Sequence, residues 1–461
     1  MYQKNSQITT GVLPVKKSDA VSTTHSNKKK LNRVSSRLPI TAFLLLTALV
    51  LFSSCDSSGT VGGDIGPGEN SVDRTTVMLN DLETVDLNTF SGRLQRASMG
   101  YLEDPLYGDI QAVALLKPSI SRASVDSIRD DATMTLKVHF SNAVYGDENA
   151  VSSYEIFEAG GIWRGNELKY NSEVPVDFSS KVGEFQVTDE DSIEVELSEA
   201  WLQKFKSFFD GPSTTRDSTY VNDFPGLAIV AAQSNQNIRY IRFSPESEDD
   251  RSVTRFLVYS DAFAPDDDDD DENGDDDNGD NGNGDGDEDE GPFSRVLDVR
   301  DWGSSVVRTN EPVSTDGFVL HNSERVLRVN TDISSEDLKG RNIVNASLVL
   351  TLRTDAEAAF PNINRQPVET IRGHSFRIVP NDLVSELFVR NPRFFAPIDE
   401  DTNAYRLDVT QYVLNQVYGD GSEGPIFVSL QSINGFLYSG LFYDETATDT
   451  QRPRIVITFV E

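Results

Sequence analysis

The chain contains few of the residue types that carry most enzyme chemistry. Its 461 residues include one cysteine, Cys55, which excludes an internal disulfide and a CxxC motif. The four histidines are scattered without metal-ligand spacing (His25, His139, His321 and His374), and no GxSxG, HExxH or phosphate-loop motif occurs. We therefore expect a protein that is not an enzyme. One alternative stays open, because a carboxylate pair for glycoside hydrolysis leaves no pattern in a sequence.

Basic residues are also scarce. There are 41 Lys and Arg against 75 Asp and Glu, which gives a formal net charge of −34. A surface this acidic repels phosphate backbones, so we expect no nucleic-acid partner.

Large apolar side chains are absent from one long stretch. No apolar residue lies between Pro265 and Pro292, and 16 acidic residues fall between Asp266 and Glu290. Such a stretch cannot bury enough surface to offset the entropy of ordering, so residues 264–292 are predicted to form a disordered acidic linker.

The acidic linker contains one pattern typical of a calcium site. Asp269, Asp271, Asn273 and Asp280 follow the spacing of an EF-hand loop, with Asp at the position where Glu normally gives bidentate ligation. No amphipathic helices flank it, and in so biased a composition the alternative is a chance match with loose calcium association. We expect no other cofactor.

The N-terminal segment has the organisation of a secretory signal. Basic residues up to Arg37 precede an apolar run over 40–52, which is shorter than the roughly 20 residues that span a bilayer. Residues 1–54 are therefore predicted to be a signal peptide. Ser53, Ser54 and Cys55 follow the run. This resembles the lipobox of bacterial lipoproteins, although Leu51 lies one position further from the cysteine than usual. The resemblance implies lipidation of Cys55; the alternative is an ordinary cleavage near Ser54 that leaves a free thiol.

Residues 55–71 are rich in Gly and Ser and poor in apolar residues, which predicts a flexible tether. Such a start resembles that of surface lipoproteins of Bacteroidota-type bacteria. The resemblance implies a lipid anchor in the outer membrane with the protein exposed at the cell surface.

The two halves that flank the acidic linker show an internal repeat. GLAIVAAQSNQN at 226–237 matches GPIFVSLQSING at 424–435. The aligned pairs are Gly226 and Gly424, Val230 and Val428, Gln233 and Gln431, Ser234 and Ser432, and further on Arg255 and Arg454. We infer a duplicated domain, over 72–263 and 293–461; the alternative is two unrelated β domains with common turn chemistry.

Each half predicts strands and one short helix. Apolar residues alternate with polar ones over 132–140 and 346–353, as in half-buried strands. Apolar residues recur at helical spacing in both halves (Trp201, Phe205 and Phe208 after Ser198; Val409, Val413 and Val417 before Gly419). Asn434-Gly435 predicts a tight hairpin. The fold expected is mostly β, with two related antiparallel β-sandwich, jelly-roll-like domains that each carry a short helix and are joined by the disordered acidic linker.

Three motifs of the second half, NASLVLTL, LDVTQYVLNQV and QRPRIVITF, together resemble the DNRLRE family of β-sandwich domains over about 293–459. That resemblance implies a module of secreted bacterial proteins, some of whose relatives bind polysaccharide. GYLEDPLYGD and DSIEVEL in the first half resemble an uncharacterised family of Bacteroidota lipoproteins. Neither resemblance supplies a catalytic residue.

Four aromatic residues stand among Gly and acidic residues that predict loops, namely Tyr107, Tyr145, Trp163 and Tyr170. An exposed ring there could stack on a sugar; the alternative is that the rings fold back over the end of a sandwich. Gln233-Ser234 and Gln431-Ser432 are candidates for a binding site that is present in both halves; the alternative is that they form turn-capping hydrogen bonds. The function expected is a non-enzymatic surface lipoprotein that captures glycans. The alternatives are a structural or adhesive envelope protein with protein partners, and a polysaccharide hydrolase.

Overall fold

The first of two β-rich lobes takes its strands from the middle of the chain. The computed structural model describes residues 71–87, 89–121, 128–244, 252–260, 294–312, 317–333, 335–430 and 434–460. Lobe 1 lies within residues 90–309. Its strands are β3 (Arg96–Asp104), β4 (Gly108–Pro118), β5 (Thr133–His139), β6 (Tyr145–Gly146), β7 (Ser152–Ala159), β8 (Val176–Val187), β9 (Ser192–Glu196), β10 (Leu227–Ala231), β11 (Asn237–Arg242), β12 (Arg255–Tyr259) and β13 (Ser294–Thr309). Its helices are η1 (Ser91–Arg93), α2 (Glu199–Phe209) and α3 (Arg216–Asp223).

Lobe 2 combines the described N-terminal strands with the C-terminal part of the chain. Its strands are β1 (Val72–Met78), β2 (Leu82–Asp86), β14 (Gly317–His321), β15 (Arg325–Val329), β16 (Asn342–Thr351), β17 (Thr370–Ser375), β18 (Phe394–Asp399), β19 (Ala404–Asp408), β20 (Ile426–Leu430), β21 (Ser439–Tyr443) and β22 (Arg454–Val460). Its helices are α4 (Ser335–Leu338), α5 (Thr354–Ala358), α6 (Leu383–Val389) and α7 (Thr410–Tyr418).

Each lobe is an antiparallel, sandwich-like β structure around its own core, as the alternating sequence predicts. The described residues form one 11-stranded arrangement per lobe. In lobe 1, side chains of β5 and β12 meet those of β4, β7, β10 and α2 in one hydrophobic cluster. In lobe 2, β16 and β22 meet β15, β17, β20 and α7 in the same way. The segment Asn70–Glu461 forms one compact unit.

The two lobes share one strand order, which supports the predicted duplication. β5 lies between β12 and β9 in lobe 1, and β16 lies between β22 and β19 in lobe 2. β10 lies between β4 and β7, as β20 lies between β15 and β17. β11 pairs with β3 as β21 pairs with β14, and α2 and α7 follow the equivalent strands β9 and β19.

The predicted hairpin at Asn434-Gly435 is wrong. β20 pairs with β15 and β17, whereas β21 pairs with β14, so the chain crosses between strands here and does not turn back. Gly435 has a φ of 93°, and a Cβ atom there would lie 2.5 Å from the carbonyl oxygen of Arg96 in lobe 1. Close approach to the other lobe, and not a type I′ turn, therefore explains this glycine.

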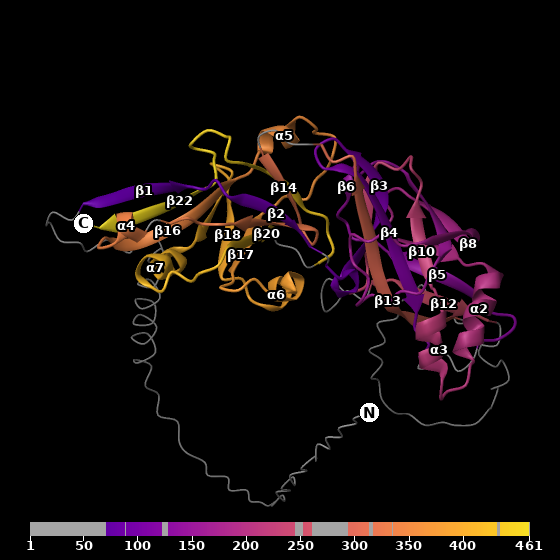
Figure 1. The fold of residues 1–461 in the computed structure, drawn as a ribbon. Helices are drawn as coiled ribbons and strands as arrows, with labels where there is room; N and C mark the ends of the chain where they lie inside the picture. The colour runs from indigo at the N-terminus through magenta and orange to yellow at the C-terminus, as the bar shows by residue number, and fades with distance from the viewer. Residues whose placement is uncertain are drawn as a thin grey trace, which may run out of the picture. The chain divides into compact units, whose positions relative to one another are not determined.

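The strand pairing corrects the domain ranges expected from the sequence. β1 and β2 fall in the first expected range, but they pair with β22 and β15 of lobe 2. β13 falls in the second range, but it pairs with β12 and β4 of lobe 1 (Figure 1). The ranges failed because pairing depends on which sheet edge is open, and a boundary placed by composition carries no such information.

The acidic run consequently connects two neighbouring strands of one lobe. β12 and β13 pair in a register that places Tyr259 opposite Ser294, on either side of residues 261–293. The run therefore does not separate two independent modules. The signal peptide, tether and linker predictions themselves concern residues 1–70 and 261–293, which lie outside the described residues.

Both predicted helices are present. In α2, Trp201, Leu202, Phe205 and Phe209 are buried, while Phe208 is only partly buried and packs at the edge of the core. In α7, Tyr412, Val413 and Val417 are buried, and the helix ends at Gly419. Short helices α3 to α6 add to the one per half that was expected. No helix in the described part of the chain is long and apolar enough to cross a bilayer.

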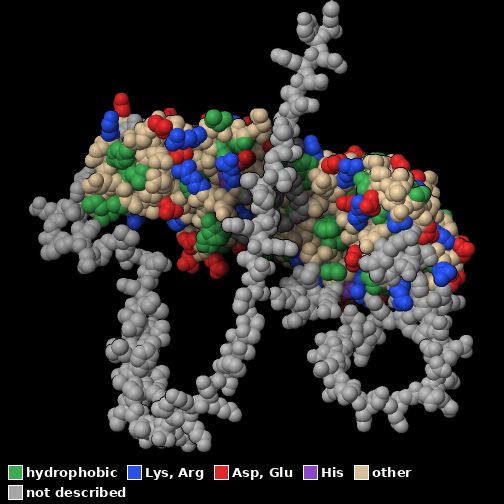
Figure 2. Space-filling model, turned by 90° about the horizontal axis from the view of Figure 1, so that it is seen from below, with side chains coloured by type: hydrophobic (Ala, Val, Ile, Leu, Met, Phe, Trp, Pro, Cys, Tyr) green, Lys and Arg blue, Asp and Glu red, His purple; other side chains and the backbone are tan. Residues whose placement is uncertain are grey.

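Acidic and basic side chains are interspersed on the surface of both lobes. On the face that Figure 2 shows, Lys and Arg lie among Asp and Glu and do not form one basic field. The described lobes therefore carry mixed charge on this face, unlike the acidic run.

Candidate functional site

The four aromatic residues predicted as sugar-stacking candidates are buried. Tyr107, Tyr145 and Tyr170 are each 1% exposed, and Trp163 is 7% exposed. The expectation of exposed rings is therefore wrong, and the packing alternative describes them correctly. Gly and acidic neighbours predicted loops, but loop residues between two lobes can be as buried as a core.

Each of these four aromatics also has a polar partner at its tip. Tyr107 donates a hydrogen bond to Oε1 of Glu357 at 2.6 Å, and Tyr145 donates to Oδ2 of Asp104 at 2.8 Å. The Tyr170 hydroxyl lies 3.5 Å from Oγ of Ser98. Trp163 Nε1 donates to the carbonyl of Pro225 at 2.7 Å, and Lys117 Nζ lies 4.9 Å from the centre of its ring. These contacts fix the rings as structural elements.

Tyr107 and Tyr145 belong to the contact region between the lobes, which we call the joint and which contains a buried ion pair. Asp104 of β3 accepts hydrogen bonds from Nε and Nη2 of Arg365 in lobe 2, at 3.0 and 2.8 Å. Their side chains are 0% and 7% exposed. Burial on its own would raise the pKa of Asp104, but hydrogen bonds and charge from Arg365 outweigh it, so the pKa lies below its usual value.

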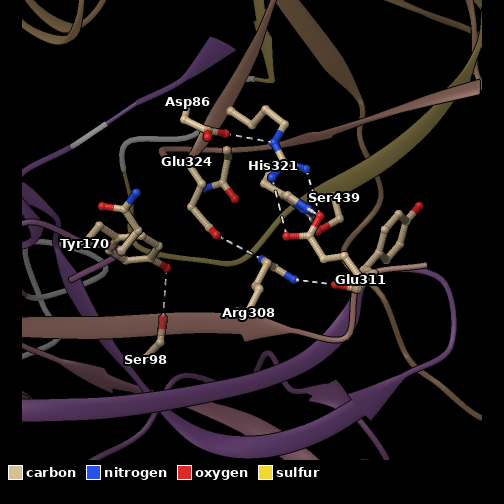
Figure 3. A network of polar contacts seen from close by, with 12 residues as sticks. Asp86, Ser98, Tyr170, Arg308, Glu311, His321, Glu324 and Ser439 are labelled. Carbon is tan, nitrogen blue, oxygen red and sulfur yellow. Dashed lines mark hydrogen bonds and ion pairs between the residues drawn. The ribbon is translucent and has the colours of Figure 1, made fainter. Parts of the chain in front are cut away.

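A second polar cluster joins β13 to lobe 2 (Figure 3). Arg308 of β13 forms a buried ion pair with Glu324 at 3.0 Å. Nδ1 of His321 lies 2.8 Å from Oγ of Ser439, and Glu311 forms an ion pair with Arg325 at 2.8 Å. Burial and the neighbouring Arg308 lower the pKa of His321, so this imidazole stays neutral near pH 7. The cluster therefore links β13 to lobe 2 through paired charges and hydrogen bonds.

Apolar contacts complete the joint. Leu437 is fully buried among Ile110, Ile238 and Tyr240 of lobe 1, and its backbone N–H donates to the Tyr240 hydroxyl at 3.2 Å. Phe436 packs edge-to-face on Tyr240 with ring centroids 4.8 Å apart. These contacts come from Phe436 and Leu437, which lie between β20 and β21. Gln431 and Ser432 themselves lie outside the described residues.

A cleft with a volume of about 1050 Å³ lies beside this joint. It is lined by the end of β3, by two loops of lobe 1, which we call one wall, and by a loop of lobe 2, which we call the other wall. The lining residues are Tyr101 to Glu103, Gly146 to Asn149, Gln233 to Gln236, and Pro361 to Arg365.

Backbone contacts fix the two walls against each other. The N–H of Gly146 donates to the carbonyl of Asn364 at 2.8 Å, and the reverse bond measures 2.9 Å. Gly146 has a φ of 110°, and a Cβ atom there would lie 2.4 Å from the carbonyl oxygen of Gln236. Asn235 is buried and exchanges hydrogen bonds with the backbone of Ser153. The cleft is therefore pre-formed.

The side chains that line the cleft are mainly amides and carboxylates. Gln233, Ser234, Gln236, Asn149, Asn362 and Asn364 are exposed, as are Glu103 and Glu148. Tyr101 is half-buried, and its hydroxyl donates to Oε1 of Glu103 at 3.3 Å. The arginine of the cleft, Arg365, is already paired with Asp104. The cleft can therefore offer many hydrogen bonds and net negative charge to a ligand.

Only part of this site could be predicted from the sequence. Gln233-Ser234 were candidates for a site, and both line the cleft, while the side chain of the neighbouring Asn235 is hydrogen-bonded to the backbone of Ser153. The loops 146–149 and 361–365 were not anticipated. Their Asp, Glu and Asn residues were the available signal, but polar loops of this kind occur widely, and only the fold brings these two together.

No metal centre is evident where the structure can be described. No cluster of three or more His, Cys, Asp or Glu side chains suited to a metal ion occurs among the described residues. The calcium candidates Asp269, Asp271, Asn273 and Asp280, and the lipidation candidate Cys55, lie outside them.

Comparison with protein-family models found no matching family, and a search of curated proteins found no match. The resemblances drawn from short motifs therefore remain predictions.

Proposed function

We propose that this protein is a non-enzymatic surface lipoprotein that binds glycans in the cleft between its lobes. The observation that carries the proposal is the lining of the cleft, which combines amide side chains from both lobes, carboxylates from lobe 1 and the half-buried Tyr101. Each amide offers a donor and an acceptor, and each carboxylate offers two acceptor oxygens. Neighbouring hydroxyls of a sugar match such pairs, and a tyrosine ring can stack on the apolar face of a pyranose.

The charge and size of the cleft narrow the ligand class. Glu103, Asp147 and Glu148 line it, and the guanidinium of Arg365 is already neutralised. Neutral and amino sugars therefore fit, while uronic acids and sulfated sugars are repelled. Its volume of about 1050 Å³ lies at the upper end of the roughly 300–1,000 Å³ typical of small-molecule sites. We therefore expect an oligosaccharide and not a single sugar.

The cellular location in the proposal comes from the sequence. A predicted signal peptide over 1–54, followed by Cys55 and a Gly-rich tether, supports a lipid-anchored protein exposed at the outer membrane. A protein anchored in this way meets polysaccharides before they enter the cell, which agrees with capture as its task.

The test is a glycan array followed by titration calorimetry with the full-length protein in detergent. The double variant Gln236→Ala/Asn362→Ala removes one amide from each wall. With about 0.5–1.5 kcal/mol per hydrogen bond, the dissociation constant should rise about fivefold to more than a hundredfold. Gln203→Ala, an exposed residue of α2 outside the cleft, is the matched control and should bind as the parent does.

Two results would contradict the proposal. One is the absence of binding to any neutral or amino glycan, which would favour the structural or adhesive alternative. The other is binding that the cleft variant leaves unchanged. Release of shortened glycan during the titration would instead favour the hydrolase alternative.

A further inference from the structure

Each lobe is completed by strands that bridge two sheet edges. In lobe 1, β13 pairs with β12 through its first residues and with β4 through the rest. In lobe 2, β1 pairs with β22 and β2 pairs with β15, which are the equivalents of β12 and β4. β1 and β2 therefore take the place in lobe 2 that β13 has in lobe 1. We call residues 72–86 the strap.

The strap belongs to lobe 2, but the chain that follows it is fixed in lobe 1. The N–H of Leu87 donates to the carbonyl of Glu324 in lobe 2 at 2.6 Å. Only a few residues later, the N–H of Ser91 donates to the carbonyl of Leu168 at 2.9 Å, and that of Gly92 donates to the carbonyl of Gly165 at 3.0 Å. Leu87 contacts both lobes, because its carbonyl accepts a hydrogen bond from Nδ2 of Asn171 in lobe 1 at 3.2 Å. The residues of the strap that precede it pair with lobe 2.

Few side chains hold the strap in place. Most of its residues are exposed, and Val77, Leu82 and Val85 are only partly buried. Leu79 is its one fully buried apolar residue among those described. Leu87, directly after the strap, is buried beside Val326 and Phe427 of lobe 2. Arg325 and Arg328 of β15 form ion pairs with Asp86 and Glu83, whose exposed carboxylates contribute little to stability. The strap is therefore attached mainly through backbone hydrogen bonds along its two registers.

The equivalent strand of lobe 1 is more firmly packed. Leu297 lies in the main core of lobe 1, and Val306 lies in the cluster at the joint. Trp302 stacks on Phe243 with ring centroids 5.0 Å apart and donates from Nε1 to the carbonyl of Leu94 at 2.9 Å. Local opening takes place first where few apolar contacts are lost, so the strap should open before β13 does.

An open strap leaves two unpaired strand edges on lobe 2. Such edges bind extended chains through their free N–H and C=O groups. The sequence that fits both registers, with Leu79 in its core position, is the strap itself. We propose that lobe 2 carries a strand-binding groove between β22 and β15, and that its partner is the strap of a second copy of this chain.

In the resulting dimer each lobe 2 is completed by the strap of the other molecule. Every contact of the strap with lobe 2 is reproduced, so the exchange needs no new complementary surface. The connection within Leu87–Ser91 is the segment whose path changes. Because the strap makes the same contacts in the monomer and in the dimer, the monomer–dimer equilibrium depends on the association of two chains. Exchange therefore increases with the local concentration of the protein.

A cross-link in register tests the exchange in the full-length protein. Thr76 lies opposite Val456 in the β1–β22 register, so Thr76→Cys/Val456→Cys in a Cys55→Ser background places two thiols across the groove. The protein is incubated over a range of concentrations, below the urea concentration that unfolds it, and is then oxidised and resolved by non-reducing electrophoresis. We expect an interchain disulfide whose yield relative to the intrachain disulfide rises about tenfold for each tenfold rise in protein concentration.

The control moves one cysteine out of register. In Asp73→Cys/Val456→Cys the strap cysteine lies opposite Phe459 and not Val456, so neither cross-link should form efficiently. A labelled peptide of residues 71–87 gives a second measurement. It should bind the full-length protein with saturation, and the same peptide with Leu79→Asp should not. Intrachain cross-links alone at every concentration, equal interchain yield from the out-of-register pair, or no saturable peptide binding would each overturn the proposal.

Discussion

The ion pair between Asp104 and Arg365 should be among the most important single contacts for stability. Asp104→Asn keeps the shape of the side chain and removes its charge. The Arg365 guanidinium, 7% exposed, then keeps its charge in the joint without its counter-ion. Breaking one side of a buried ion pair costs about 3–5 kcal/mol, because the remaining charge is desolvated and uncompensated. We expect Asp104→Asn to lower the free energy of unfolding by that amount.

The measurement is urea unfolding followed by two probes. All three tryptophans, Trp163, Trp201 and Trp302, lie in lobe 1, so their fluorescence reports on that lobe, while circular dichroism reports on both. The double variant Asp104→Asn/Arg365→Met also removes the guanidinium charge that Asp104→Asn alone leaves without a counter-ion. It should therefore be less destabilised than the sum of the two single variants, which measures the coupling directly.

The control is an exposed pair. Asp420 and Arg377 lie 3.4 Å apart with side chains that are each 59% exposed, and such a pair contributes about 0–1 kcal/mol. Asp420→Asn should therefore leave the unfolding midpoint nearly unchanged. If Asp104→Asn cost no more than this control, the joint would not depend on its ion pair, and the reasoning from burial would be refuted.

Three further predictions concern pH, a glycine and the acidic run. Burial lowers the pKa of His374 to about 4, so the folded protein binds fewer protons than the unfolded one between about pH 4 and 6.5. The free energy of unfolding should therefore fall by up to about 3 kcal/mol as the pH drops from about 6.5 to 4. His374→Gln should flatten this part of the plot of stability against pH. Gly435→Ala should destabilise strongly because its Cβ would overlap the backbone of Arg96, whereas Gly340→Ala, with a similar φ of 89° and no atom within 4 Å, should cost only about 1 kcal/mol; equal losses would contradict the argument from close approach. A protease site inserted within residues 264–292 should give two fragments that stay together on native gel filtration and separate in denaturant, since each fragment donates strands to the other lobe; fragments that separate without denaturant would disprove the strand assignment.

The local patterns of the sequence determined the elements of this fold. Alternation over 132–140 and 346–353 specifies strands with one apolar face, and helical spacing around Phe205 and Val413 specifies α2 and α7. These patterns depend only on which faces are apolar, a property that neighbouring residues express by themselves. The repeat between the two halves was visible for the same reason, because equivalent strands preserve their apolar positions.

Only the tertiary structure decided which strands pair, which loops are buried and where a ligand can bind. A strand pattern specifies the face that a strand buries, but not the partner along its edge, so the strap and β13 could not be assigned to their lobes. Tyr107 and Tyr145 are in segments that predict exposed loops, and they are buried because a second lobe covers them. The cleft depends on Gly146 and Asn364, more than two hundred residues apart, being paired through their backbones. Contacts of such long range arise from the sum of all packing in both lobes, and no local stretch of sequence contains them.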